Sequence, residues 1–450
     1  MPRRLHRISR VGDGGGSGSG SRAARVGGSG SGPARVGGGS VSRAARAVRV
    51  LAAGGLTAAA VSASPVAATS VAASASSDPG LRDVLVVGNA QAGTVSVIDG
   101  HTFANLGSIN VVPDLAQRMF EIDINPVWLA GYQTVKAIEG GDRFVDDATV
   151  SPDGRTLYVS RGNLDDVAAF DLATHAELWH TRLAGFHADH AALSPDGTRY
   201  VVSATTAQVA QVVNTANGAV VGSFSTGTYP HQNDYSADGR YIYNSSIGIT
   251  SLPQALEWAK GSFRLTKVDA HTLQTVQTWT LPHGIRPNEI AADGHTFYAD
   301  LSYLNGFVKY DLASSKILNT VQMPFASGGR TLKADDYPKN SAHHGLALSG
   351  DGAKLCDVGT IDDYTAIVAT SSLGTTGMVT YPAGALPYWG QTSADGHYCF
   401  VSLSNRGEVS VVDFATATEV ARVPVGAFPQ RERIARIAAS VVGGLDPAVG

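Results

Sequence analysis

The sequence predicts an all-β protein built from a repeated four-stranded unit, and three observations support that prediction. The tetrapeptide Ser-x-Asp-Gly occurs five times, and the shortened form Ala-Asp-Gly occupies a sixth position. Each copy lies between short strands rich in Tyr and Val. The three shortest spacings between successive copies are 42, 43 and 44 residues, the length of one four-stranded unit. The copies occupy residues 151–154, 194–197, 236–239, 292–294, 349–352 and 393–396.

Each copy predicts the first hairpin of its unit. Asp and Gly tolerate the positive φ angles of a tight turn, so an Asp-Gly pair between apolar runs indicates a hairpin. A Tyr- or Val-rich strand follows the turn, as at residues 156–160 and 398–402. A third strand then ends at an Asp, as at residues 167–171, 307–311 and 409–413, and a fourth strand closes the unit. Such a unit is typical of one blade of a β-propeller.

A seventh unit is divided between the two ends of the chain. Residues 84–90, 94–99 and 106–111 predict the second, third and fourth strands of a blade that lacks its first strand. Residues 429–437 predict one extra strand without partners of its own. Pairing these pieces closes the ring and removes two exposed sheet edges. The sequence therefore predicts a seven-bladed β-propeller whose C-terminal strand closes blade one.

The repeats resemble a known family. The unit VSVVDFATATEVARVPVGAFPQ at residues 409–430 and the strands LYVS and CFVS are similar to the YVTN-repeat β-propellers, also called YncE-like. That family belongs to the wider group of seven-bladed, quinoprotein-dehydrogenase-like propellers. The resemblance covers residues 84–437 and implies the fold. It implies little about chemistry, because its members differ in what they bind.

Residues 1–77 differ in composition from the rest and are predicted to be a leader. Residues 11–40 are almost entirely Gly, Ser, Ala, Arg and Val, which bury too little apolar surface to fold. A basic stretch ending at Arg49, a short apolar run and small residues that suit cleavage follow, the layout of a secretory signal peptide. We therefore expect a secreted or cell-wall-associated protein, with a propeller at 78–437 and a tail at 438–450.

The charge distribution argues against nucleic acid as a partner. Ten of the 34 basic residues and one of the 38 acidic residues precede residue 50, and residues 50–77 carry none. The chain from Asp78 onward therefore has 24 basic and 37 acidic residues, a net charge of −13. Phosphate contacts need clustered Lys and Arg. The apolar run of the leader is also shorter than the roughly 20 residues of a membrane span, so we expect no membrane-spanning segment.

The two cysteines, Cys356 and Cys399, occupy equivalent strands of neighbouring blades. Because facing sheets lie about 10 Å apart, we expect two packed free thiols, with a disulfide as the alternative.

Three long insertions are predicted on the same face of the ring, where the loops that enter the inner strands open. They are residues 112–144, 247–263 with a short helix at 253–260, and 323–342. Long loops gathered on one face of a rigid scaffold are the usual place for a binding site.

Polar side chains gather at the start of the predicted inner strands. Three imidazoles and several carboxylates that converge on one axis match the ligand types of Zn, Cu or Fe. The candidate ligands of a divalent metal are Asp189, His190, His231 and His344. The candidate residues for binding another ligand are Asp146, Asp147, Asn288, Glu289, Tyr388, Trp389 and Arg431. The alternative for each histidine is a structural bond between loop and strand, which is the more common role of a histidine at this position. The alternative for the two aromatic residues is wall packing.

Two classes of function remain open. The first is a secreted, monomeric binding or scaffold propeller that recognises a small molecule, a glycan or an envelope protein on the insertion-bearing face. The second is an enzyme (an oxidoreductase, lyase or lactonase) with a metal or another cofactor at the channel mouth. A redox role like that of the propeller subunits of quinoprotein enzymes rests on fold analogy alone. The body has no Cys-x-x-Cys-His and no Gly-x-Ser-x-Gly motif, which argues against covalent haem and a serine hydrolase.

Overall fold

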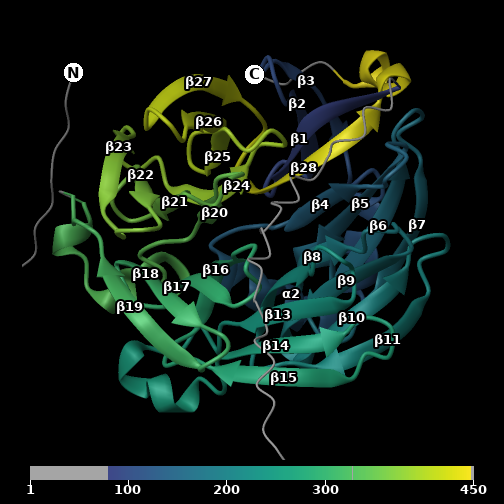
Figure 1. Cartoon of the computed structure of the whole chain (residues 1–450). Coiled ribbons are helices and arrows are strands. Elements are labelled where there is room, and N and C mark those ends of the chain that lie inside the picture. Colours follow the sequence, from purple (N-terminus) through teal and green to yellow (C-terminus); the bar gives the residue numbers. More distant parts are fainter. Residues whose placement is uncertain (1–79, 327, 447–450) are drawn as a thin grey trace, which may run out of the picture. The chain divides into compact units, whose positions relative to one another are not determined.

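Seven four-stranded sheets stand around a common axis like the blades of a propeller (Figure 1). The computed structural model describes residues 80–326 and 328–446. Every strand pair in these residues is antiparallel, and six of the sheets consist of four consecutive strands. This arrangement confirms the predicted seven-bladed β-propeller. The predicted leader, residues 1–77, lies outside the described residues.

The strands of each blade follow one another outward from the channel. The innermost strands of blades one to seven are β28 (Pro429–Ala438), β4 (Asp147–Val150), β8 (Ala188–Leu193), β12 (Pro230–Tyr235), β16 (Ile285–Ile290), β20 (Leu346–Leu348) and β24 (Pro387–Thr392). The second strands are β1 (Leu81–Asn89), β5 (Thr156–Arg161), β9 (Arg199–Ala204), β13 (Tyr241–Ser246), β17 (Thr296–Leu301), β21 (Lys354–Gly359) and β25 (Tyr398–Leu403). The third strands are β2 (Thr94–Asp99), β6 (Asp166–Asp171), β10 (Val209–Asn214), β14 (Arg264–Asp269), β18 (Gly306–Asp311), β22 (Tyr364–Ala369) and β26 (Glu408–Asp413). The outermost strands are β3 (Asn105–Asn110), β7 (Glu177–Arg182), β11 (Val220–Ser225), β15 (Thr275–Thr280), β19 (Lys316–Gln322), β23 (Thr375–Thr380) and β27 (Thr418–Pro424).

The C-terminal strand closes the ring. Strand β28 pairs with β1 from the Leu81–Ala438 pair to the Asn89–Pro429 pair, with a bulge near the second. Figure 1 shows the two ends of the described chain side by side in blade one. After β28, Asp446 forms a bridge with Ser108 of β3. The predicted closure is therefore confirmed.

The Ser-x-Asp-Gly elements form the expected turns. In blade two, Ser151 Oγ donates a hydrogen bond to Asp153 at 2.5 Å, and the Gly154 amide donates to the Ser151 carbonyl at 2.9 Å. Gly154 has a φ of +70°, which glycine adopts without steric cost. The same serine-to-aspartate bond recurs in blade seven between Ser393 and Asp395. The carboxylate at this position is thus committed to the turn.

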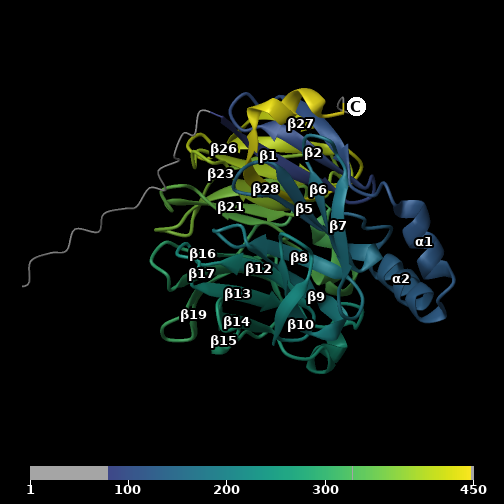
Figure 2. The ribbon, with the colours of Figure 1, turned by 90° about the vertical axis from the view of Figure 1, so that its right-hand side faces the viewer.

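The first insertion, residues 112–144, contains two helices that the sequence analysis did not predict. They are α1 (Leu115–Asp123) and α2 (Pro126–Glu139). The Asn125 side chain caps α2 by accepting hydrogen bonds from two first-turn amides at 3.0 and 3.2 Å, and Gly140 ends it in the left-handed conformation. Figure 2 shows both helices projecting from one face of the propeller.

Buried ion pairs join this insertion to blade two. Arg161 of β5 is fully buried and lies 2.7 Å from both Asp166 and Asp114, the residue that precedes α1. Arg118 of α1 reaches the same Asp166 at 2.9 Å. Asp114 and Arg118 belong to the insertion, and Arg161 and Asp166 belong to blade two, so these buried ion pairs hold the insertion on the propeller.

The other two insertions are held by 3₁₀ turns. The helix predicted at 253–260 is the 3₁₀ segment η3 (Gln254–Ala259). The remaining 3₁₀ segments are η1 (Gly162–Leu164), η2 (Thr205–Ala207), η4 (Gly329–Thr331), η5 (Ala334–Asp336), η6 (Pro338–Asn340) and η7 (Ala439–Gly444). In the part of the chain that the structure describes, no helix is both long and apolar enough to span a bilayer.

The expectation of two free thiols is wrong, because Cys356 of β21 and Cys399 of β25 form a disulfide. Their Cα atoms lie 6.4 Å apart, well inside the roughly 10 Å spacing assumed for facing sheets. Blades converge toward the axis, and two glycines, one just before β20 and one on β24, let blades six and seven approach closely. A Cβ added to Gly345 would lie 2.8 Å from the Gly390 amide nitrogen.

Removing this disulfide should lower the stability of the propeller. The bond closes a loop with a sequence separation of 43, for which the chain-entropy model gives roughly 4 kcal/mol. The double variant Cys356→Ala and Cys399→Ala is therefore expected to unfold at lower urea concentration than the oxidised protein. Wild-type protein kept in dithiothreitol is the matched control and should move to a similar midpoint. Equal midpoints for all three samples would contradict the prediction.

Candidate functional site

A cavity of about 540 Å³ opens at the channel mouth on the face that carries the insertions. Helix α2 forms its apolar side through Val127, Ala130 and Ile138, and Phe186 and Ile247 extend that wall. The opposite side is polar and consists of residues at the start of the inner strands. The volume lies within the range of small-molecule pockets, so one end of the propeller offers an open, concave site with an apolar and a polar wall.

The polar wall follows the symmetry of the ring. In each of blades two to seven, the residue seven positions before the Asp of the Asp-Gly turn lies where the chain enters the inner strand. The residues at this position are Asp146, Asp189, His231, Arg286, His344 and Tyr388, and Gln430 is their counterpart on β28. All of them except His344 line the cavity. The scaffold therefore presents one different side chain per blade to the same space.

Three of the predicted metal ligands come together. One donor atom each from Asp189, His190 and His231 lies within 4.8 Å of the others, and all three residues are buried. The rings of His190 and His231 are 4.4 Å apart between centroids. The ring of His344 lies 5.5 Å from that of His231, so it borders this group. Two imidazoles and one carboxylate are a ligand set suited to Zn or Fe with open positions.

The imidazoles of this group have unused ring nitrogens. Both ring nitrogens of His190, Nδ1 of His231 and Nε2 of His344 are buried without a hydrogen-bond partner among the described residues. Burial lowers the pKa of all three side chains well below the ordinary value, and the nearby cations Arg431 and Arg286 lower it further. The three imidazoles are therefore neutral at pH 7, the form that binds metals.

A second cluster adjoins the first through Asp189. His187 Nε2 lies 2.9 Å from Asp146 Oδ2, and the His187 amide donates to Asp165 at 2.8 Å. Burial opposes the charge on His187, but the Asp146 carboxylate prevails and raises its pKa to about 10. Burial raises the pKa of Asp189 to about 7, against the opposite effect of His187. His187 has a φ of +70°, a conformation rare outside glycine, and it lines the cavity.

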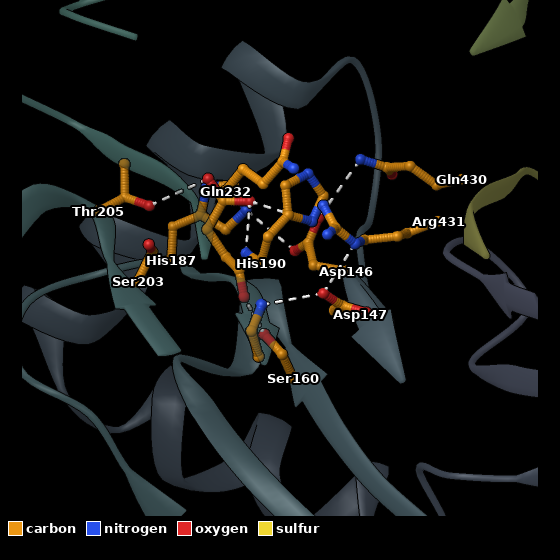
Figure 3. A network of polar contacts seen from close by, with 12 residues as sticks. Asp146, Asp147, Ser160, His187, His190, Ser203, Thr205, Gln232, Gln430 and Arg431 are labelled. Carbon is orange, nitrogen blue, oxygen red and sulfur yellow. Dashed lines mark hydrogen bonds and ion pairs between the residues drawn. The ribbon is translucent and has the colours of Figure 1, made fainter. Parts of the chain in front are cut away.

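Asp147 is the centre of a buried charge cluster below the cavity. Its carboxylate lies 2.8 Å from Arg433 Nε and 2.9 Å from Arg431 Nε, and it accepts a hydrogen bond from the Ala191 amide at 2.9 Å. Figure 3 shows Gln430 and Arg431 of the closing strand facing Asp146 and Asp147. Asp147 and Arg431, predicted as ligand-binding residues, thus contact each other and do not line the cavity.

The predicted aromatic pair lies on the opposite side of the mouth. Tyr388 lines the cavity and stacks on His344, with ring centroids 4.0 Å apart. Trp389 packs beneath the Arg431 guanidinium at 4.0 Å and beside His190 at 5.1 Å. Tyr388 can therefore contact a bound molecule, whereas Trp389 supports the histidines from behind.

In blade five the predicted residues, Asn288 and Glu289, lie two and three positions beyond the residue that lines the cavity. Asn288 hydrogen-bonds to Gln232, Ser245 and the Arg286 carbonyl and lies outside the cavity lining. Glu289 lies deeper still, where burial and the Asp234 carboxylate raise its pKa to about 8. The residue of blade five that lines the cavity is Arg286. The constant seven-residue spacing to the turn Asp would have identified it.

The known proteins that resemble this chain do so in fold. No protein-family model and no curated protein sequence matches it. It is similar to hydrazine synthase of Kuenenia stuttgartiensis, with 18% identity and a TM-score of 0.49 over 64% of this chain and 88% of that chain. It is also similar to the dihydro-heme d1 dehydrogenase NirN in complex with DHE, with 13% identity and a TM-score of 0.50 over 80% of this chain and 76% of that chain. At 13% identity the likeness to NirN shows the β-propeller fold alone, and membership of the YVTN-repeat family stays a prediction.

Proposed function

We propose that the protein is a metal-dependent enzyme that acts on a small organic molecule held in the channel-mouth cavity. The metal ligands are Asp189, His190 and His231, with His344 beside them. The observation that carries the proposal is the set of buried, unpartnered imidazole nitrogens next to a carboxylate. A cavity of about 540 Å³ adjoins this set, so a bound metal would face the substrate space. The reaction classes that suit such a centre are oxidation, elimination and lactone hydrolysis.

A purely structural role for these histidines is less consistent with the contacts. A structural histidine at the entry to a propeller strand bonds its loop through a ring nitrogen. His343, next to the cluster, does so: its ring nitrogens lie 2.7 Å from Asp357 and 3.1 Å from Asn305. His190 makes no such bond with either nitrogen. Leaving buried polar atoms unpaired costs about 1–3 kcal/mol each, which metal coordination would offset.

The disulfide supports the proposal that the enzyme is exported. Disulfides form and persist in oxidising compartments and are rare in the cytosol. Cys356 and Cys399 are fully buried between blades six and seven, so their bond belongs to the core of the fold. Together with the predicted signal peptide, it favours a secreted or cell-wall-associated protein.

The metal content of the purified protein tests the proposal. Preparation without chelators and mass spectrometry of the metals should find about one equivalent of Zn, Cu or Fe per chain. The His231→Ala variant removes a central ligand and should lower that content at least about tenfold. The matched control is His271→Ala, because His271 is exposed on a surface turn and its loss should leave the metal content unchanged.

Two results would contradict the proposal. One is wild-type protein that contains no metal and takes up none from added Zn²⁺, Cu²⁺ or Fe²⁺. The other is an unchanged metal content in the His231→Ala variant, which would remove His231 from the site. Either result would leave the alternative, a metal-free propeller that binds a small molecule, glycan or envelope protein.

A further inference from the structure

Arg286 is an exception among the buried arginines of this chain. Five arginines of the described residues are buried, and Arg286 is 1% exposed. The other four each lie within 4.0 Å of a carboxylate. No such ion pair exists for Arg286 in the part of the chain that the structure describes. The four paired arginines are Arg118, Arg143, Arg161 and Arg431.

The contacts that Arg286 does make are neutral. Its Nε donates to Ser302 Oγ at 3.1 Å, and its Nη2 donates to the Lys339 carbonyl. These two bonds fix the plane of the guanidinium group, and its remaining Nη1 group has no partner among the described residues. A buried charge with only neutral partners is costly. Arg286 also lines the cavity, so the missing negative charge can come from a bound molecule.

The neighbouring cations already have a carboxylate partner. Lys339 forms an ion pair with Glu139 of α2, and Arg143 lies 3.7 Å from the same carboxylate, so Arg286 is the cation here that has no carboxylate within ion-pair distance among the described residues. One guanidinium with one free edge carries a single positive charge, which matches the single negative charge of a carboxylate more closely than the double charge of a phosphate dianion. Arg286 lies in the ring between His231 and His344, so an anion bound there would place its adjacent atoms beside the proposed metal ligands.

The apolar side of the cavity indicates the chemistry of the rest of the bound molecule, beyond its negatively charged group. Val127, Ala130 and Ile138 of α2 present an apolar surface that only an apolar group would cover favourably. We propose that the substrate is an amphipathic monocarboxylic acid whose carboxylate binds Arg286 and whose apolar part packs against α2. This inference names the substrate class of the proposed enzyme and rests on the same cavity.

A matched pair of probes tests the inference. Titration calorimetry with 4-phenylbutyrate and 4-phenyl-1-butanol compares a carboxylate with an alcohol of the same body. The acid should bind the wild-type protein about 10- to 100-fold more tightly, because an ion-paired hydrogen bond is lost in the alcohol. Arg286→Met should remove this preference, and Arg286→Lys should keep part of it. The control Arg264→Met, at an exposed position of β14, should leave the preference unchanged.

The readouts separate this inference from the proposed function. The titrations are run on protein as purified and after removal of metal by a chelator, and thermal melting checks that each variant is folded. Equal affinities of the wild-type protein for the two probes, or binding of neither, would overturn the inference whatever the metal content. A preference for the acid in protein that contains no metal and takes none up would support the inference. The proposal of a metal-dependent enzyme would then be contradicted without affecting the carboxylate site. The comparison needs no variant, so a misfolded Arg286→Met does not weaken it.

Discussion

A chain truncated after Ala427, and so without strand β28, is expected to lose cooperative folding. Strand β28 is the inner strand of blade one and covers one edge of β1 along the whole of that strand. Residues 84–87 of β1 are at most 1% exposed, and the truncation would leave them on a free sheet edge beside an incomplete channel. Exposed apolar edges pair with other chains. Size-exclusion chromatography should therefore show aggregates, and circular dichroism should show no cooperative thermal transition.

Two controls make this experiment specific to ring closure. A chain truncated after Asp446 keeps β28 and its bridge to Ser108, and should melt like the full-length protein. A synthetic peptide of residues 428–446, added during refolding of the shorter chain, should restore part of the transition by supplying the missing strand in trans. A truncated chain that remains monomeric with an unchanged melting temperature would show that six blades and three strands suffice.

The fold was predictable because each blade repeats the same local signals. A turn such as Ser151–Gly154 needs one particular backbone geometry, and its residues are visible in a single sequence. Closure could also be anticipated, since residues 429–437 have no other partner in the repeat pattern. Helices α1 and α2 were missed because their stability depends on distant contacts. Arg118 of α1 forms an ion pair with Asp166 of β6, and such a distant contact cannot be recognised from the sequence of the helix.

The site was harder to predict because blades differ where they face the cavity. Asp189, His190 and His231 were identified from residue type, and the structure brings them together. Arg286 was missed in favour of Asn288 and Glu289, although blades three and four, whose inner strands carry the same bulge, place the residue seven positions before the turn Asp at the mouth. The disulfide was misjudged because the distance between blades depends on small residues elsewhere, such as Gly345 and Gly390.

The ring also explains how one scaffold can carry a site with mixed chemistry. Each blade contributes one side chain from the same position, so neighbouring blades can place an acid, an imidazole and a guanidinium side by side. Asp189, His231 and Arg286 come from blades three, four and five in this way. The proposed metal centre and the proposed carboxylate site are thus adjacent because they come from neighbouring blades. Each site can be altered by one substitution without changing the strand pattern.

Among single substitutions in the channel, we expect one at the centre of the charge cluster below the cavity to lower the stability of the protein most. Asp147 is fully buried and ion-pairs with both Arg431 and Arg433 of the closing strand. Burial and the neighbouring Arg433 lower the pKa of Arg431 to about 10, so Arg431 is still charged at neutral pH. Asp147→Ala would leave two cations without a counter-charge, and we expect it to lower the free energy of unfolding by about 3–5 kcal/mol. Urea unfolding followed by tryptophan fluorescence measures this loss.

Companion variants separate the effect of the lost charge from the effect of the lost side-chain shape. Asp147→Asn keeps the shape and an acceptor for the Ala191 amide but not the charge, so most of the decrease in the free energy of unfolding should remain. Removing the whole cluster, with Asp147→Leu, Arg431→Met and Arg433→Met together, should recover much of the stability, because no arginine is then left without its Asp147 partner. If Asp147→Ala costs less than about 1 kcal/mol, a typical surface effect, the closing strand is held by its pairing with β1 and not by these charges. If instead the triple variant is less stable than Asp147→Ala, the arginines stabilise the channel through contacts other than Asp147, such as the stacking of Arg431 on Trp389.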